Sequence, residues 1–152
     1  EHSMEALPGG RLDRLSRLPD DILQQILSSL PTTEAVLTSL LSRRWRHLWR
    51  FLPCLDFDYG SFHQARRSWR CGFSEFVGHV MSTRDPAVAV QRFRLHWPRR
   101  DEDATRLAPS WVEGLHGDLR DLDLHLHSFE GFRLERVLHS APSLEVLRLE
   151  TN

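Results

Sequence analysis

The sequence contains no lysine, so all 20 positively charged side chains among its 152 residues are arginines. Isoleucine occurs twice, and tyrosine and asparagine occur once each. These four amino acids share AT-rich codons, so a GC-rich coding sequence accounts for the pattern without selection on charge. Net charge is −1, which predicts no overall attraction to nucleic acid or to an anionic membrane.

Long apolar runs and paired cysteines are missing as well. No run reaches the roughly 20 residues that a membrane span needs, and we expect neither a span nor a secretory leader. Cys54 and Cys71 are 17 positions apart without metal-ligand spacing, which favours two reduced thiols in an intracellular protein. Glu1 to Ser3 are interpreted as a cloning remnant ahead of Met4, within a flexible lead-in that covers residues 1–13.

Three short helices are predicted between residues 19 and 52. The first begins at Pro19, where proline suits a first turn, and ends at Pro31. Thr32 or Thr33 can cap the second, and Ser42 can cap the third, which stops before Pro53. Each helix carries a broad apolar face. A unit this small rarely buries such faces against itself, so part of the surface should bind a partner.

Residues 15 to 58 resemble an F-box of the plant type that precedes leucine-rich repeats. They read LSRLPDDILQQILSSLPTTEAVLTSLLSRRWRHLWRFLPCLDFD. The matching features are the opening "LP", the "ILQQI" helix, the "TSLLS" segment, the "RRWRHLW" helix and the closing "LDFD". We therefore assign residues 14–58 to the F-box and residues 59–84 to a linker with a connecting helix.

The resemblance implies a partner and a role. An F-box docks on a Skp1-type adaptor, which joins it to cullin and RING subunits, and such a chain acts as the substrate receptor of an SCF E3 ubiquitin ligase without catalysing anything itself. The residues expected at the adaptor interface by motif match are Leu18, Pro19, Ile22, Leu23, Ile26, Leu41, Arg44, Trp45, Leu48 and Trp49. A scaffold or decoy that binds Skp1 but recruits no substrate is the main alternative.

The "RRWRHLWR" stretch, residues 43–50, also admits a nucleic-acid interpretation. Its arginines could bind phosphates while Trp45 and Trp49 stack on bases. At helical spacing, however, the tryptophans share one face and most of the arginines lie on the other. Such tryptophans are poorly placed for tracking a phosphate backbone, so the sequence favours an adaptor or core role.

A repeated pattern follows over residues 85–152. The motif apolar-x-x-apolar-x-apolar starts at Val90, Leu119 and Leu144, with spacings of 29 and 25 residues, which are close to leucine-rich-repeat periods. Helical spacings separate the three motifs. The predicted fold is therefore α plus α/β: a three-helix F-box followed by a short, incomplete leucine-rich-repeat solenoid with three strands in a small parallel sheet.

The residues between the apolar positions of these strands should form the concave face of the sheet. Stacking in register aligns Arg94, Asp123 and Arg148, a candidate surface for a protein substrate. A stabilising ladder of alternating charges, worth about 0.2–1 kcal/mol per pair, is the favoured interpretation of this row.

No pattern of catalytic residues is found. His125 and His127 alternate on a predicted strand without a third ligand nearby, so no metal is expected. No glycine-rich phosphate loop is present, so no cofactor is expected. The missing lysines admit a second hypothesis in this context, namely resistance of a ligase subunit to its own ubiquitination. The expected location is the cytoplasm or nucleus.

Overall fold

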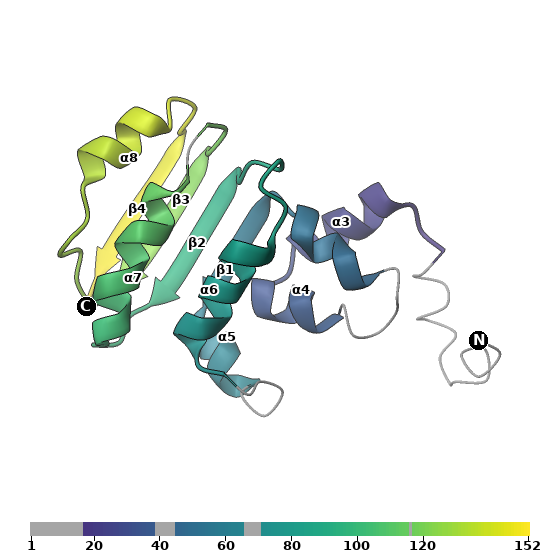
Figure 1. The fold of residues 1–152 in the computed structure, drawn as a ribbon, viewed down its shortest axis with the longest axis horizontal. Coiled ribbons are helices and arrows are strands. Elements are labelled where there is room, and N and C mark those ends of the chain that lie inside the picture. Colours follow the sequence, from purple (N-terminus) through teal and green to yellow (C-terminus); the bar gives the residue numbers. More distant parts are fainter. Residues whose placement is uncertain (1–16, 39–44, 66–70, 116) are drawn as a thin grey trace.

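The computed structural model describes residues 17–38, 45–65, 71–115 and 117–152. Its centre is a four-stranded parallel sheet in the order β1-β2-β3-β4 (Figure 1). The strands are β1 Cys54–Asp58, β2 Arg92–Trp97, β3 Asp121–Leu126 and β4 Val146–Thr151. The strands are thus laid down in chain order, each beside the previous one.

Helices connect successive strands. After β1 come α5, Tyr59–Gln64, and α6, Phe73–Thr83; after β2 comes α7, Glu102–Glu113; after β3 comes α8, Leu134–Ser140. Figure 1 shows α6 and α7 on the same side of the sheet. Asp58 fixes the first of these connections, because its carboxylate accepts hydrogen bonds from Gly60 N and Ser61 Oγ at the start of α5.

The amino-terminal helices lie beside β1 (Figure 1). They are α3, Asp20–Ser28, α4, Thr32–Thr38, and the 3-10 helix η1, Trp45–Phe51. Asp20 and Asp21 lie in the first turn of α3, where the helix dipole favours negative charge. Backbone and side-chain contacts join this helical unit to the segment that follows α6: Asp85 N donates to Arg50 O at 2.9 Å, and Arg84 Nη2 donates to Leu52 O at 3.0 Å.

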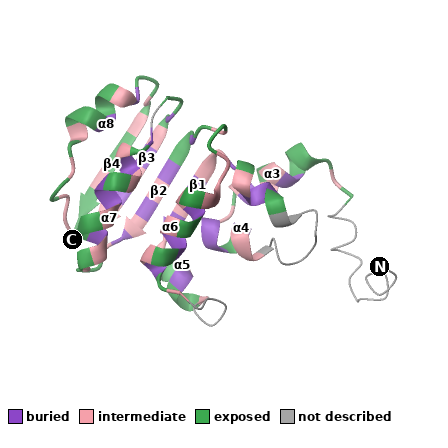
Figure 2. Ribbon diagram, viewed as in Figure 1, coloured by how far each residue is buried: buried purple, intermediate pink, exposed green. Residues whose placement is uncertain are grey.

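One face of the sheet is buried and the other is open. Along β2 and β3, buried apolar residues alternate with partly exposed polar ones (Figure 2). Covered by helices on one face only, these parallel strands alternate in polarity instead of forming continuous hydrophobic runs. The buried strand residues that form the floor of the core are Leu55, Phe57, Phe93, Leu95, Trp97, Leu122, Leu124 and Leu126.

A recurrent hydrogen-bond pattern marks the start of each strand pair. The backbone carbonyl just before one strand accepts from two consecutive amides at the start of the next, at 2.7–3.2 Å. The acceptors are Pro53, Gln91 and Arg120, and their donor pairs are Gln91 with Arg92, Arg120 with Asp121, and Glu145 with Val146. The same local geometry therefore occurs three times along the chain.

The sheet has one strand more than the sequence predicted. The expectation of three strands is wrong because "LDFD", assigned to the end of the F-box, forms most of β1. Leu55 and Phe57 pair in parallel register with Phe93 and Leu95, and all four are buried. The sheet therefore begins inside the segment 14–58, and the helical unit and the sheet share one hydrophobic core.

The helices that connect the strands agree with the sequence-based prediction better than the number of strands does. The apolar spacing around residues 73–81 predicts α6, and the segments between the repeated motifs contain α7 and α8. The six-residue α5 was not predicted. The third helix of the amino-terminal unit is a 3-10 helix over residues 45–51; the expected cap, Ser42, lies outside the described residues.

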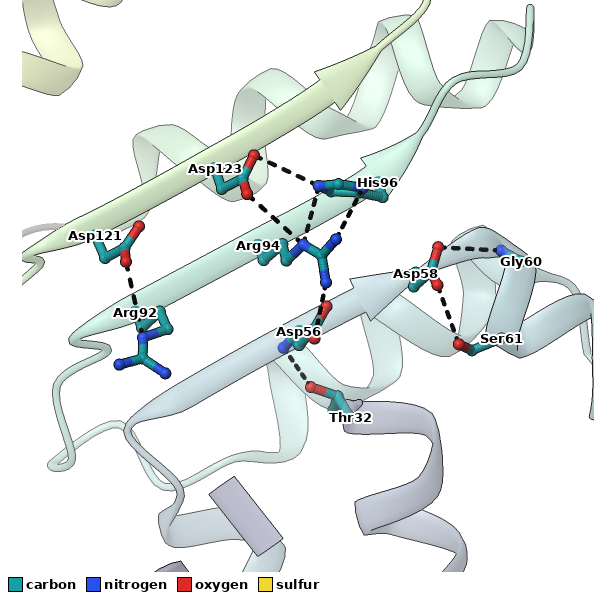
Figure 3. Close-up of polar contacts among 10 residues, drawn as sticks. All are labelled: Thr32, Asp56, Asp58, Gly60, Ser61, Arg92, Arg94, His96, Asp121 and Asp123. Carbon is teal, nitrogen blue, oxygen red and sulfur yellow. Dashed lines mark hydrogen bonds and ion pairs between the residues drawn. The ribbon is translucent and has the colours of Figure 1, made fainter. Parts of the chain in front are cut away.

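Thr32 and Thr33 are both buried, but only one of the two hydroxyls has a partner. Thr32 Oγ1 accepts a hydrogen bond from Asp56 N at 2.6 Å (Figure 3). This bond satisfies an amide on the side of β1 that does not pair with β2. The hydroxyl of Thr33 is buried without a hydrogen-bond partner.

Thr32→Val should therefore lower the free energy of unfolding by about 1–3 kcal/mol, because it leaves the Asp56 amide unsatisfied. Thr33→Val makes the same chemical change where no hydrogen bond is lost, so it should be neutral or stabilising. Urea denaturation of both variants checks the pair. A loss of equal size in the two variants would contradict the role assigned to Thr32.

Candidate functional site

The residues expected at the adaptor interface fall into two groups in the structure. Pro19 and Ile22 are exposed on or beside α3, with Ile22 36% exposed, and Leu18 and Ile26 are partly exposed. These four positions together form the α3 face. Two of the others, Leu41 and Arg44, lie outside the described residues, as does the side chain of Trp45.

The second group is buried in the chain itself. Leu23, Leu48 and Trp49 are 0%, 7% and 6% exposed and belong to the common core. They lie where α3 packs on η1. In this conformation they offer a partner almost no surface, so their role is to support the α3 face. Of the described residues expected at the interface, Leu18, Pro19, Ile22 and Ile26 are therefore the ones accessible to a partner.

A second candidate site is the open face of the sheet. Parallel register aligns its side chains in rows across the strands. The first row is Cys54, Arg92, Asp121 and Val146; the second is Asp56, Arg94, Asp123 and Arg148; the third is Asp58, His96, His125 and Glu150. The predicted alignment of Arg94, Asp123 and Arg148 is confirmed.

Arg94 is the centre of the polar contacts on this face (Figure 3). Its guanidinium lies 3.3 Å from Asp56 Oδ2 and 3.6 Å from Asp123 Oδ2. Its Nε also donates to His96 Nε2 at 2.9 Å, and that imidazole lies 3.4 Å from Asp123 Oδ1. One arginine thus links β1, β2 and β3 through two carboxylates.

The charge ladder expected from the sequence is only partly present. Arg94 pairs with Asp123, and Arg92 lies 3.9 Å from Asp121 in the row before. Arg148, at the end of the ladder, forms no ion pair with any described residue. The ladder therefore extends over the first three strands and stops short of β4.

Asp56 and His96 belong to this cluster but were not among the predicted site residues. Asp56 was missed because β1 was assigned to the F-box. The signal that could have found it is the alternation of "LDFD", which places Leu55 and Phe57 on one face and Asp56 on the other. His96 was missed because it lies in the next row along β2, with Asp58 and His125, and the prediction covered the row of Arg94.

Burial raises the pKa of the Asp56 carboxyl above its ordinary value, and the neighbouring Arg94 only partly opposes this effect. One of its oxygens, Oδ1, is buried without a hydrogen-bond partner. Since the pKa is higher in the folded than in the unfolded state, the folded state binds more protons between the two values. The contribution of Asp56 to stability therefore falls as pH rises through this window.

Asp56→Asn should remove this dependence. The unfolding free energy of the variant minus that of the parent should be larger at neutral pH than at acid pH. At acid pH the parent gains stability from protonation of the carboxyl, and the variant has no carboxyl to protonate. Urea denaturation of both proteins over a pH series gives the difference in unfolding free energy. A difference that stays constant, or that changes in the opposite direction, would contradict the raised pKa.

The remaining chemistry of the described residues is limited. Cys54 and Cys71 are free, as expected, and burial raises the pKa of both thiols, which lowers the fraction present as thiolate. Within the described ranges, no cluster of three or more histidine, cysteine or acidic side chains could hold a metal ion. No helix of the described part is long and apolar enough to cross a membrane.

Comparison with known proteins identifies the amino-terminal unit. Residues 15–56 match the F-box domain. These residues contain the α3 face and the first part of β1. No solved structure shows a significant match to the chain.

Most of the chain is also similar to proteins of Arabidopsis thaliana. The F-box/FBD/LRR-repeat protein At5g22700 is 35% identical over 93% of this chain and 36% of its own length. The F-box/LRR-repeat protein At4g14103 is 35% identical over 92% of this chain and 37% of its own length. A third, F-box/LRR-repeat protein At2g42720, is 35% identical over 79% of this chain.

The chain thus spans about a third of the length of these relatives, and the similarity extends through the F-box into the sheet. The match at residues 15–56 and the similarity along nearly all of the chain place this protein in the family of plant F-box/LRR-repeat proteins.

Proposed function

We propose that this chain is an F-box subunit that docks on a Skp1-type adaptor and acts as the substrate receptor of an SCF E3 ubiquitin ligase. The observation that carries the proposal is the F-box match at residues 15–56, together with exposed apolar side chains on the same segment. Cullin and RING subunits would be joined through the adaptor. The chain itself supplies no chemistry, and its site of action is the cytoplasm or nucleus.

The docking surface in this proposal is the α3 face. Buried aliphatic and aromatic anchors contribute most of the energy of protein interfaces, and Ile22 is one of the few large apolar side chains exposed among the described residues. Pro19 lies at the start of the same helix. Leu41, Arg44 and the side chain of Trp45 remain part of the proposed interface on the motif match alone.

We further propose that the sheet is a short leucine-rich-repeat solenoid. Three observations support this assignment: the strands follow chain order, the connections contain helices, and the same hydrogen-bond pattern recurs at each junction. Corresponding strand positions are 38, 29 and 25 residues apart. Solenoids offer an extended face for binding, which makes the open face of the sheet the candidate surface for a protein substrate.

Two alternatives make different predictions. A scaffold or decoy would bind the adaptor without recruiting a substrate, so its adaptor complex would support no ubiquitin transfer to any captured protein. A nucleic-acid module would bind DNA or RNA with an affinity that falls steeply with salt. The net charge of −1 argues against the second alternative.

Co-expression with a Skp1-type adaptor is the direct experiment. We expect the two proteins to co-purify as a stoichiometric complex through size-exclusion chromatography. Reconstitution with cullin and RING subunits then distinguishes a receptor from a decoy. A soluble chain that shows no association with the adaptor would overturn the proposed function.

A further inference from the structure

A groove of about 380 Å³ lies on the open face of the sheet, along the first half of the strands and beside the carboxyl end of α3. Ser28 and Ser29 form its helical wall. Among the described residues, equal numbers of acidic and basic side chains line it: Asp56, Asp121 and Asp123 with Arg92, Arg94 and Arg148. Charge counts alone therefore do not say which kind of ligand the groove would accept.

Exposure separates the two kinds of charge. The carboxylates are the more buried groups: the side chains of Asp56, Asp121 and Asp123 are 30%, 28% and 18% exposed. The arginines extend further, with the side chains of Arg92 and Arg94 62% and 41% exposed, and Arg148 is exposed as well. The surface presented to a partner is therefore formed largely by guanidinium groups, with the carboxylates beneath them.

The three arginines also differ in their free hydrogen-bonding capacity. Arg94 is occupied by two carboxylates and an imidazole. Arg92 has a single distant carboxylate at 3.9 Å, and Arg148 has no ion-pair partner among the described residues. A guanidinium has five N–H donors, so Arg92 and Arg148 retain donors for an external anion.

The register fixes the spacing of these two arginines. Arg92 is aligned with Val146, two strands away, and Arg148 lies two residues further along β4. With strands about 4.8 Å apart and about 3.3 Å per residue along a strand, the two Cα atoms are about 12 Å apart. An extended peptide covers this distance in three to four residues.

We propose that this groove binds an acidic segment of the recruited protein in extended form, with two carboxylates three or four residues apart on Arg92 and Arg148. The proposal rests on the proposed receptor function and names the class of its substrate. The partly buried Asp56 and Asp123 hold Arg94 in place between the two binding positions. A nucleic acid fits less well, because the described residues that line the groove include no aromatic side chain on which bases could stack.

The probe is a fluorescein-labelled Gly/Ser peptide that carries two glutamates four positions apart, titrated with the 152-residue chain and followed by anisotropy. Matched peptides carry glutamine or lysine at the same two positions. The glutamate peptide should bind roughly tenfold more tightly than the glutamine peptide, and the lysine peptide should not bind. Added salt should weaken binding, because the two positions are exposed.

Variants locate the site. Arg92→Glu and Arg148→Glu should each weaken binding of the glutamate peptide roughly tenfold. Both side chains are exposed, and Arg148→Gln provides a milder change at the edge strand. Arg136→Glu is the matched control: Arg136 is also exposed but lies on α8, away from the groove. Asp121→Asn should tighten binding, because it removes the carboxylate that lies 3.9 Å from Arg92 and competes for its guanidinium.

Three results would overturn the proposal: equal binding of the glutamate and glutamine peptides, an equal loss with Arg136→Glu, or tighter binding of an oligonucleotide of the same charge. Failure of the receptor function is a separate result. It would be seen as absence of the adaptor complex, which the peptide titration does not require.

Discussion

Phe57→Ala should lower the free energy of unfolding by about 3–5 kcal/mol, the usual cost of removing a fully buried aromatic ring. Phe57 is 0% exposed in β1. Its ring contacts Phe76 of α6 edge-on at a centroid distance of 6.1 Å and Phe93 of β2 at 5.8 Å. The substitution leaves a cavity between the first strand, the second strand and the helix that covers both.

The position of β1 makes this effect global. Thr32 of α4 contacts β1 on its outer side, and β2 pairs with it on the other. Loss of Phe57 should therefore destabilise the F-box segment and the sheet in a single transition, because both share the same core. Two independent modules would instead unfold in separate transitions.

Urea denaturation followed by tryptophan fluorescence tests both statements. Phe51→Ala is the matched control, since Phe51 is 39% exposed at the end of η1; its loss should cost less than about 1 kcal/mol. A small effect of Phe57→Ala, or an effect confined to the sheet, would refute the shared core. Hydrogen exchange of amides in α3 and β3 would reveal the same distinction residue by residue.

The central role of β1 was not predictable from apolar spacing alone. The strand has five residues, and its sequence lies inside a stretch that resembles the end of an F-box. The later strands were predicted because their pattern occurs three times and each recurrence strengthens the others. Phe57 instead becomes a core residue only through partners that lie 19 and 36 positions further along the chain.

On the open face of the sheet, the sequence pattern likewise predicts only part of the side-chain arrangement. Alternation along each strand predicts which residues face outward, and the internal spacing that the motifs share predicts the register that aligns Arg94 with Asp123. The pattern does not reveal that Arg94 also reaches Asp56 on β1, nor that Arg148 forms no ion pair with the residues that the structure describes. Both depend on where the long arginine side chains extend over the surface.

Within α3, helical periodicity predicted an apolar face, but it did not predict which of the apolar residues are buried and which are exposed. Ile22 and Leu23 are neighbours in the motif, yet the first is 36% exposed and the second is fully buried. The difference arises because α3 packs on α4 and η1, which cover the Leu23 side of the helix. A motif match assigns both residues to the same interface; only the packing of the helices separates them.

This division defines the sharpest test of adaptor binding. Ile22→Asp should reduce the affinity for a Skp1-type adaptor by about 2 kcal/mol or more, roughly 30-fold, because it places a charge in the centre of a desolvated interface. Folding should be almost unchanged, since the side chain is already partly in water. Leu23→Ala would be uninformative, because loss of a core residue impairs folding and binding together.

Leu138→Asp provides the matched control. Leu138 is 46% exposed on α8, at the opposite end of the sheet from α3, so the same chemical change is made on an apolar side chain outside the proposed interface (Figure 1). Co-purification with the adaptor and titration calorimetry should show loss for Ile22→Asp and parental affinity for Leu138→Asp, with equal urea midpoints. If the two variants lose affinity to the same extent, or if Ile22→Asp binds like the parent, the α3 face is not the adaptor-binding surface. The contact would then have to be made by other parts of the F-box segment.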